Sequence, residues 1–113
     1  MNKKIIYIDI DGTLCSQTDT NYKEAKPDLE TIKKVNKLYD QGNTIIIYTS
    51  RYIKRSHDNP DKSKELGYNF TFNQLKFWGL KFHQLKMGKP QFDIIIDDKA
   101  YNYDKKWIKY LKY

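Results

Sequence analysis

Polar side chains that could do chemistry follow directly after three short apolar segments of the sequence. These polar clusters are Asp9-Ile10-Asp11-Gly12-Thr13, Thr49-Ser50-Arg51 and Asp97-Asp98. In an open parallel sheet, ligands bind beyond the carboxyl ends of the strands, so we expect the three clusters to face one crevice. Carboxylates gathered there repel one another, and a divalent cation would stabilise them. An all-oxygen ligand set favours magnesium over zinc, so the sequence predicts a magnesium site at one edge of a sheet.

The first cluster contains two carboxylates in an Asp-x-Asp pattern. Asp9 and Asp11 lie two residues apart, so an extended backbone would point both side chains the same way. Gly12 lets the chain turn sharply and lets backbone amides approach an anion. Taken alone, this pattern is more often structural than catalytic. The order of the later clusters favours catalysis, because a threonine follows the second segment and an aspartate pair closes the third.

The elements that must position these residues begin with a strand–helix–strand pattern. The apolar, β-branched run Ile5–Ile8 predicts a buried strand, and residues 44–48 predict a second one. Between them, residues 26–41 predict a helix with one apolar face, with Pro27 at its first position and Gly42 after its last turn. A one-faced helix between two strands implies a parallel, right-handed crossover.

The second half of the chain is predicted to complete a single α/β domain over residues 1–113. Its expected elements are a surface loop over 51–67, a short helix over 71–79, an edge strand over 82–87, a third buried strand over 92–96 and a closing helix over 104–113. We therefore predict a three-layer, Rossmann-like fold with a small, mostly parallel sheet.

Charge and composition narrow the class of partner. The chain has 21 basic and 14 acidic residues, a net charge of +7, which favours anionic ligands. The lysines are spread along the whole chain, so nucleic acid is not the favoured partner. Cys15 is the single cysteine, which excludes an internal disulfide and a multi-cysteine zinc site. No apolar run is long enough to cross a membrane or to act as a secretory signal, so we expect a cytoplasmic protein.

Taken together, the clusters resemble the four motifs of the haloacid dehalogenase (HAD) superfamily. The matching segments are Asp9-Ile10-Asp11-Gly12-Thr13, Thr49 after Ile45-Ile46-Ile47-Tyr48, Lys89 in Gly88-Lys89-Pro90, and Ile95-Ile96-Asp97-Asp98. The resemblance implies a HAD-like fold and a magnesium-dependent phosphatase that works through an aspartyl-phosphate. The layout, including Trp78-Gly79, is similar to small capless members encoded with capsule or surface-sugar biosynthesis.

The resemblance also implies a role for each motif residue. Asp9 would be the nucleophile, and Asp11 would protonate the leaving oxygen and later activate water. Thr49 would hold a phosphoryl oxygen, and Lys89 would neutralise Asp9 and the transferred group. The implied magnesium ligands are Asp9, Asp11 through its backbone carbonyl, and Asp97 with or without Asp98. The expected substrate contacts are Gly12, Thr13, Ser50 and Arg51, with a solvated loop arginine as the alternative for Arg51.

We therefore predict a phosphomonoesterase that acts on a small, sugar-derived phosphate. The stretches between the motifs are too short for a cap domain, so the site is expected to be open, or covered by residues 51–67 or by a second copy in a homo-oligomer. One alternative is an end-processing phosphatase on nucleic acid, suggested by the net charge and ten tyrosines. A receiver-type signalling domain is disfavoured because Thr49, rather than an aspartate, ends the middle strand. A catalytically idle binding module is disfavoured by the intact motifs.

Overall fold

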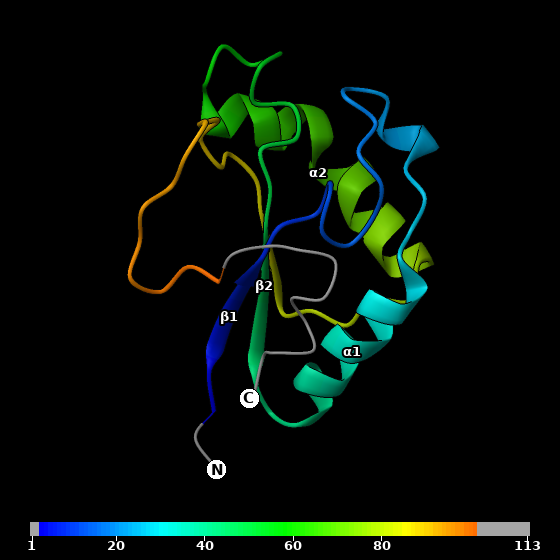
Figure 1. The fold of residues 1–113 in the computed structure, drawn as a ribbon. Coiled ribbons are helices and arrows are strands. Elements are labelled where there is room, and N and C mark those ends of the chain that lie inside the picture. Colours follow the sequence, from blue (N-terminus) through cyan, green and yellow to red (C-terminus); the bar gives the residue numbers. More distant parts are fainter. Residues whose placement is uncertain (1–2, 102–113) are drawn as a thin grey trace.

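The structure, a computed structural model, describes residues 3–101, and a parallel three-stranded sheet lies at its centre (Figure 1). The strands are β1 (Ile5–Ile8), β2 (Thr44–Tyr48) and β3 (Gln84–Lys86), in the order β1-β2-β3. Both strand pairs are parallel. The predicted α/β class with a parallel sheet is thus confirmed, and the expected edge strand over residues 82–87 contains β3.

Helix α1 (Leu29–Asp40) joins β1 to β2, as the strand–helix–strand pattern predicts. Its first turn is capped by Asp28, whose Oδ1 accepts a hydrogen bond from the Thr31 amide at 3.1 Å. The prediction that Pro27 occupies the first helical position is wrong. Pro27 instead forms an isolated β-bridge with Cys15. Asp28 is the N-cap residue, and the first helical residue is Leu29.

The prediction of a surface loop over residues 51–67 is wrong for its second half, where helix α2 (Pro60–Phe77) begins. The Asn59-Pro60 pair starts this helix: the Asn59 side chain accepts a hydrogen bond from the Lys62 amide at 3.2 Å, and Pro60 suits the first helical position. The short helix expected over residues 71–79 is the last part of α2. The polar composition of the first part hid its helical character, because few of its side chains enter the core.

Both helices pack on the same face of the sheet. Apolar side chains from the two helices join those of the strands in one buried cluster, which includes Ile8, Ile32, Val35, Ile47 and Leu75. The described residues therefore form two layers, a sheet and its helices. The helix predicted over residues 104–113, which would supply the third layer, lies outside the described residues.

The other face of the sheet is more exposed than the sequence predicts. Ile5 and Tyr7 alternate with inward-facing neighbours along β1 and are 71% and 50% exposed. Tyr7 packs edge-on against Tyr48, with ring centroids 5.7 Å apart, and its hydroxyl accepts a hydrogen bond from Lys86 Nζ at 2.8 Å. Only the inward half of β1 is buried, so the prediction of a continuously buried strand is wrong for this element.

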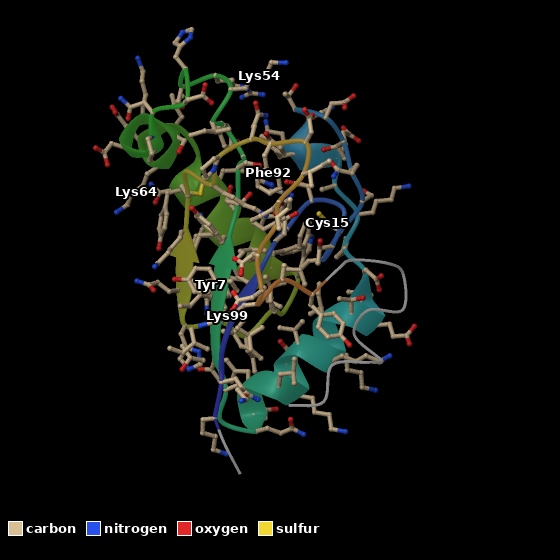
Figure 2. All side chains as sticks on the ribbon, turned by 60° about the vertical axis from the view of Figure 1, so that its left-hand side comes forward. Tyr7, Cys15, Lys54, Lys64, Phe92 and Lys99 are labelled. Carbon is tan, nitrogen blue, oxygen red and sulfur yellow. The ribbon has the colours of Figure 1, made fainter. Side chains whose placement is uncertain are left out.

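The third buried strand, predicted over residues 92–96, does not form in the structure. Residues 87–101 contain no helix or strand, and Ile94 and Ile96 are 79% and 95% exposed. Figure 2 draws this segment, which carries Phe92, without a strand arrow. Its apolar run has no strand partner here, so its backbone and side chains stay open to solvent. Within residues 3–101, no helix is long and apolar enough to span a membrane.

The close packing of α2 on the loop after β2 leads to a stability prediction. Gly67 lies buried in α2, and a Cβ at this position would collide with the ring of Tyr52. Alanine favours helix by about 1 kcal/mol over glycine. We expect Gly67→Ala nevertheless to lower the free energy of unfolding by about 1–3 kcal/mol, because the Tyr52 ring must move. Urea denaturation measures this change.

The matched control places the same substitution in a Tyr52→Ala background, where the collision is absent. There, Gly67→Ala should raise stability, as helix propensity alone predicts. A stabilising effect in both backgrounds would contradict the packing of Tyr52 on α2.

Candidate active site

The chain beyond β1 forms a tight loop that carries Asp9 and Asp11. The Ile10 carbonyl accepts hydrogen bonds from two later amides, those of Thr13 at 3.0 Å and Leu14 at 2.8 Å. These bonds fold the loop back over the end of the strand. Both aspartates are thereby fixed at the carboxyl end of the sheet, as the sequence predicts.

Gly12 allows this loop to close. Its φ is +82°, and the Gln17 side chain fills the position that a Cβ would occupy. The Gly12 amide donates to the Cys15 carbonyl at 2.9 Å, and the Gln17 side-chain amide donates to the Asp11 carbonyl at 3.2 Å. The amides of Gly12 and Thr13 are thus used inside the loop, and their predicted contact with substrate stays a prediction.

Asp9 and Lys89 form an ion pair across the strand ends, with Lys89 Nζ 3.7 Å from Asp9 Oδ1. The Lys89 amide donates to the Thr49 carbonyl at 3.0 Å, which ties the lysine to the end of β2. Gly88 has a φ of +86° and lies against Pro60, leaving no room for a Cβ. The start of α2 therefore fixes the turn that aims Lys89 at Asp9.

The surroundings of Asp9 do not fully compensate the negative charge of its carboxylate. Burial raises the pKa of the Asp9 carboxyl above its usual value, and the positive charge of Lys89 offsets only part of this effect. The nearby negative charge of Asp11 also raises it. The ionised form of Asp9 is therefore under-compensated, and a cation bound beside it would stabilise that form.

Asp11 forms a second ion pair, with Arg51. The Arg51 Nε lies 2.8 Å from Asp11 Oδ2, and a terminal nitrogen of the guanidinium lies 2.9 Å from Oδ1. Another nitrogen donates to the Gln74 side-chain oxygen at 2.6 Å. Arg51 is only 1% exposed, so the alternative of a solvated loop arginine is wrong. All three guanidinium nitrogens of Arg51 contact protein groups, so the guanidinium is not free to make the substrate contact expected from the sequence.

Thr49 is buried directly after β2 and accepts hydrogen bonds from the backbone amides of both Arg51 and Lys89. Its amide donates to the Lys86 carbonyl at 3.0 Å, and its hydroxyl oxygen accepts a hydrogen bond from the Arg51 amide at 3.1 Å. Its predicted contact with a phosphoryl oxygen stays a prediction. Ser50 follows in the turn, where its carbonyl accepts from the Ile53 amide at 3.1 Å.

Asp97 and Asp98 do not join this group in the structure. Both are exposed, and Asp97 Oδ1 accepts a hydrogen bond from the Lys99 amide at 2.8 Å within its own turn. Among residues 3–101, no three acidic, histidine or cysteine side chains gather closely enough to hold a metal ion. The predicted carboxylate cluster is thus only partly assembled, because the strand that should deliver Asp97 does not form.

The oxygen donors that are present match magnesium in kind. Asp9 offers an under-compensated carboxylate, and the carbonyl of Asp11 lies in the same loop. Magnesium in proteins typically uses one or two carboxylates and completes its shell with water and substrate phosphate. The Asp11 carboxylate is less suited to this purpose, since Arg51 occupies both of its oxygens.

Three residues near the second ion pair were not anticipated from the sequence. Gln74 comes from α2, Tyr22 from the short 3-10 helix η1 (Tyr22–Glu24), and Cys15 from the loop after β1. The Cys15 thiol donates to Asp11 Oδ1 at 3.5 Å, and burial raises its pKa to about 12. A glutamine and a tyrosine in polar stretches carry no chemical pattern, so no sequence signal marks them.

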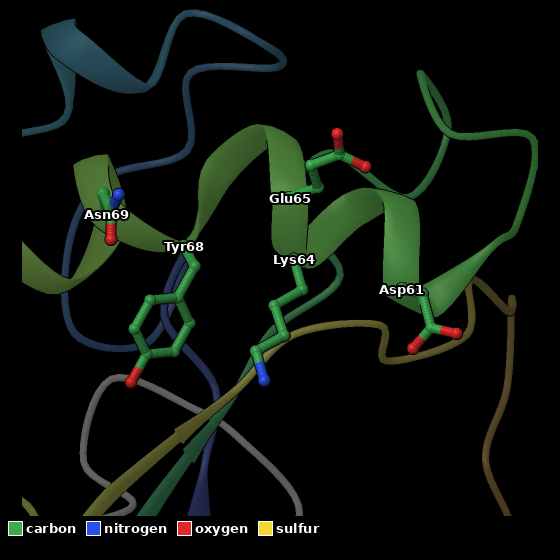
Figure 3. A pocket seen from close by; sticks show the side chains of 5 residues that line it. All are labelled: Asp61, Lys64, Glu65, Tyr68 and Asn69. Atoms are coloured by element: carbon green, nitrogen blue, oxygen red, sulfur yellow. The ribbon is translucent and has the colours of Figure 1, made fainter.

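Two hollows on the surface lie away from the Asp9–Lys89 pair. One, of about 400 Å³, runs along α2 and is lined by Asp61, Lys64, Glu65, Tyr68 and Asn69 (Figure 3). A single helix supplies all of its walls, which makes it a shallow groove. A second hollow, of about 280 Å³, lies between η1 and the loop after β2. Neither contains a residue of the predicted motifs.

Comparisons with known proteins place the fold. No model of a known protein family matches the chain, and no curated protein sequence matches it. Among solved structures, the crystal structure of a target protein from Vibrio cholerae is similar, with a TM-score of 0.84 and 23% sequence identity. The similarity covers 98% of this chain and 90% of that one. Fold and site together define an α/β protein with charged side chains at the carboxyl ends of a parallel sheet.

The raised pKa of Asp9 predicts how this residue affects stability. The folded protein keeps the Asp9 proton to a higher pH than the unfolded chain, so stability falls as pH rises between the two pKa values. Above both values, the ionised carboxylate weakens the fold. We therefore expect Asp9→Asn to raise the melting temperature at pH 7 in magnesium-free buffer. The difference from wild type should shrink as pH falls through that window.

Thermal denaturation followed by circular dichroism measures this effect. Asp58→Asn is the matched control, since Asp58 is exposed in a loop and should change little. A lower melting temperature for Asp9→Asn than for wild type would mean that the Lys89 ion pair outweighs the cost of burial.

Proposed function

We propose that the chain is a magnesium-dependent phosphomonoesterase of the HAD-like type, working through an aspartyl-phosphate on Asp9. The observation that supports it most is the 3.7 Å pair of Asp9 and Lys89 at the strand ends. Asp11 lies two residues further on, and its partner Arg51 donates its backbone amide to the buried hydroxyl of Thr49. The proposed nucleophile and acid–base carboxylate both follow β1, the balancing cation follows β3, and the Thr49 hydroxyl follows β2, the strand between them.

In the first proposed half-reaction, a carboxylate oxygen of Asp9 attacks phosphorus as the bond to the leaving oxygen breaks. Protonated Asp11 gives its proton to that oxygen, so the product leaves as an alcohol. Lys89 stabilises the negative charge shared by Asp9 and the phosphoryl oxygens. The Thr49 hydroxyl donates to one of these oxygens. An acyl phosphate then remains on Asp9.

In the second half-reaction, the now ionised Asp11 takes a proton from water as its oxygen attacks phosphorus. The bond from phosphorus to the Asp9 oxygen breaks, which releases inorganic phosphate and regenerates both carboxyl groups in their starting states. Lys89 again offsets the charge that returns to Asp9. The two aspartates therefore have separate tasks in the proposed reaction, and each has its own cationic partner.

Magnesium, when bound, would neutralise the charge between Asp9 and the substrate phosphate. The Asp9 carboxylate and the Asp11 carbonyl would hold it. The proposal includes Asp97 as a further ligand, with Asp98 as its alternative or companion. This requires residues 92–98 to lie against the strand ends, an arrangement that differs from the one described above.

The substrate class proposed is a small, sugar-derived phosphate, in the context of capsule or surface-sugar biosynthesis in the cytoplasm. This part rests on the resemblance of the motifs to small capless members of the superfamily. The net charge of +7 is compatible with a phosphorylated metabolite. In the described residues, the segments between the motifs hold η1, α1 and α2, without an inserted cap domain.

Phosphate release from a panel of sugar, polyol, nucleotide and amino-alcohol phosphates tests this function. With magnesium present, we expect turnover of at least one class, and Asp9→Asn should abolish it because the nucleophile is lost at nearly constant volume. Asp58→Asn, an exposed aspartate outside the site, should retain the wild-type rate. Near-normal turnover by Asp9→Asn would refute the assigned nucleophile.

Removal of the metal gives an independent test. Excess chelator should silence the enzyme, and added magnesium should restore the rate, since the phosphate and Asp9 would otherwise repel each other. Circular dichroism before and after chelation checks that the fold is retained. Activity that persists in excess chelator would contradict the magnesium-dependent mechanism.

A further inference from the structure

We propose that Arg51 positions the carboxylate of Asp11 for proton transfer, an inference that rests on the proposed function. Four residues form what we call the Arg51 clamp: Arg51, Asp11, Gln74 and Tyr22. The loop after β1, the loop after β2, α2 and η1 each contribute one of them. The clamp is a site feature that the motif pattern does not contain.

The contact between Arg51 and Asp11 has the geometry of a fork. Two nitrogens of the guanidinium meet the two carboxylate oxygens, at 2.8 Å and 2.9 Å. Such a bidentate pair fixes the plane of the carboxylate as well as its position. The Asp11 side chain is 17% exposed, while that of Arg51 is completely buried. The guanidinium therefore holds the carboxylate from behind and leaves its outer side open.

The far side of the guanidinium is held equally firmly. Its remaining nitrogen donates to Gln74 Oε1 at 2.6 Å, and Gln74 Nε2 donates to the Tyr22 carbonyl at 2.7 Å. The Tyr22 ring lies 4.7 Å from the guanidinium carbon, within range of a cation–π interaction. Arg51 is thus anchored by a helix and by an aromatic face, so it cannot follow Asp11 if that side chain rotates.

This arrangement separates positioning from substrate binding. A buried arginine whose nitrogens all have protein partners has little capacity left for a substrate carboxylate or second phosphate. Its effect on the reaction must pass through Asp11. A displacement of about 1 Å at a proton-transferring group can cost about 100-fold in rate. Loss of the fork should therefore lower the rate of proton transfer and leave substrate affinity nearly unchanged.

Arg51→Lys tests the role, because lysine keeps the charge but cannot form the fork. The test follows the first half-reaction by rapid quench, before Asp11 acts as a base. For an alkyl phosphate whose leaving oxygen needs a proton, we expect alcohol release to slow by about 100-fold, with the substrate concentration for half-maximal rate nearly constant. The p-nitrophenolate group leaves readily without a proton, so its release from p-nitrophenyl phosphate should slow by less than about 10-fold. A purely structural defect would lower both rates equally.

Two controls keep this test interpretable. Arg55→Lys alters an exposed arginine of the same loop, which also lies over the Tyr22 ring, and should leave both rates unchanged. Gln74→Leu removes one hydrogen bond to Arg51 but leaves the Arg51 and Asp11 side chains unsubstituted. It should reproduce the selective loss on alkyl phosphates in milder form. If Arg51→Lys does not fold, as judged by circular dichroism, Gln74→Leu carries the test alone.

The outcomes of these experiments distinguish the positioning role of Arg51 from the proposed phosphatase function. A wild-type protein without phosphatase activity would overturn the proposed function, and the role of Arg51 with it. Active wild-type protein with an equal loss on both substrates, or no loss, would overturn the positioning role alone. A raised KM with unchanged kcat would instead make Arg51 a substrate-binding residue and would also overturn it.

Discussion

Two acidic side chains share one short loop and must both be balanced at the same edge of the sheet. Asp9 is balanced by Lys89, which approaches from the turn after β3, and Asp11 by Arg51, which approaches from the loop after β2. Parallel pairing makes this possible, because all three strands end at one edge. The pairs differ in strength: the first is loose and partly exposed, whereas the second is a buried fork. Under the proposed function, that difference suits a nucleophile that must react and a carboxylate that must be aimed.

Close packing at two glycines holds the backbone that carries the two cationic side chains. Gly88 can pass close to Pro60 only without a side chain, and this approach brings Lys89 to the strand ends. The packing of Tyr52 against Gly67 fixes the backbone next to Arg51 in the same manner. α2 therefore does more than cover the sheet, since it supplies Gln74 and supports both loops that carry the cations.

Much of this arrangement could be predicted from the sequence, and the limits have physical causes. Apolar runs ending in polar residues located β1, β2 and the strand-end positions of Asp9, Asp11 and Thr49, because strand burial depends on local pattern. The partner of Arg51 could not be predicted, since it depends on how three distant segments pack. The strand expected over residues 92–96 would have to pair with a strand distant in the sequence, and local hydrophobicity does not determine whether such a long-range pairing forms.

The thiol of Cys15 has a consequence for how such a protein would respond to oxidative stress. Burial raises the pKa of this thiol to about 12, so the protonated thiol dominates at neutral pH, and the side chain is buried beside the Asp11 carboxylate. Peroxide and alkylating reagents attack the thiolate form. A buried thiol that stays protonated beside Asp11 is therefore expected to react more slowly with such reagents than the exposed thiolate of a cysteine nucleophile.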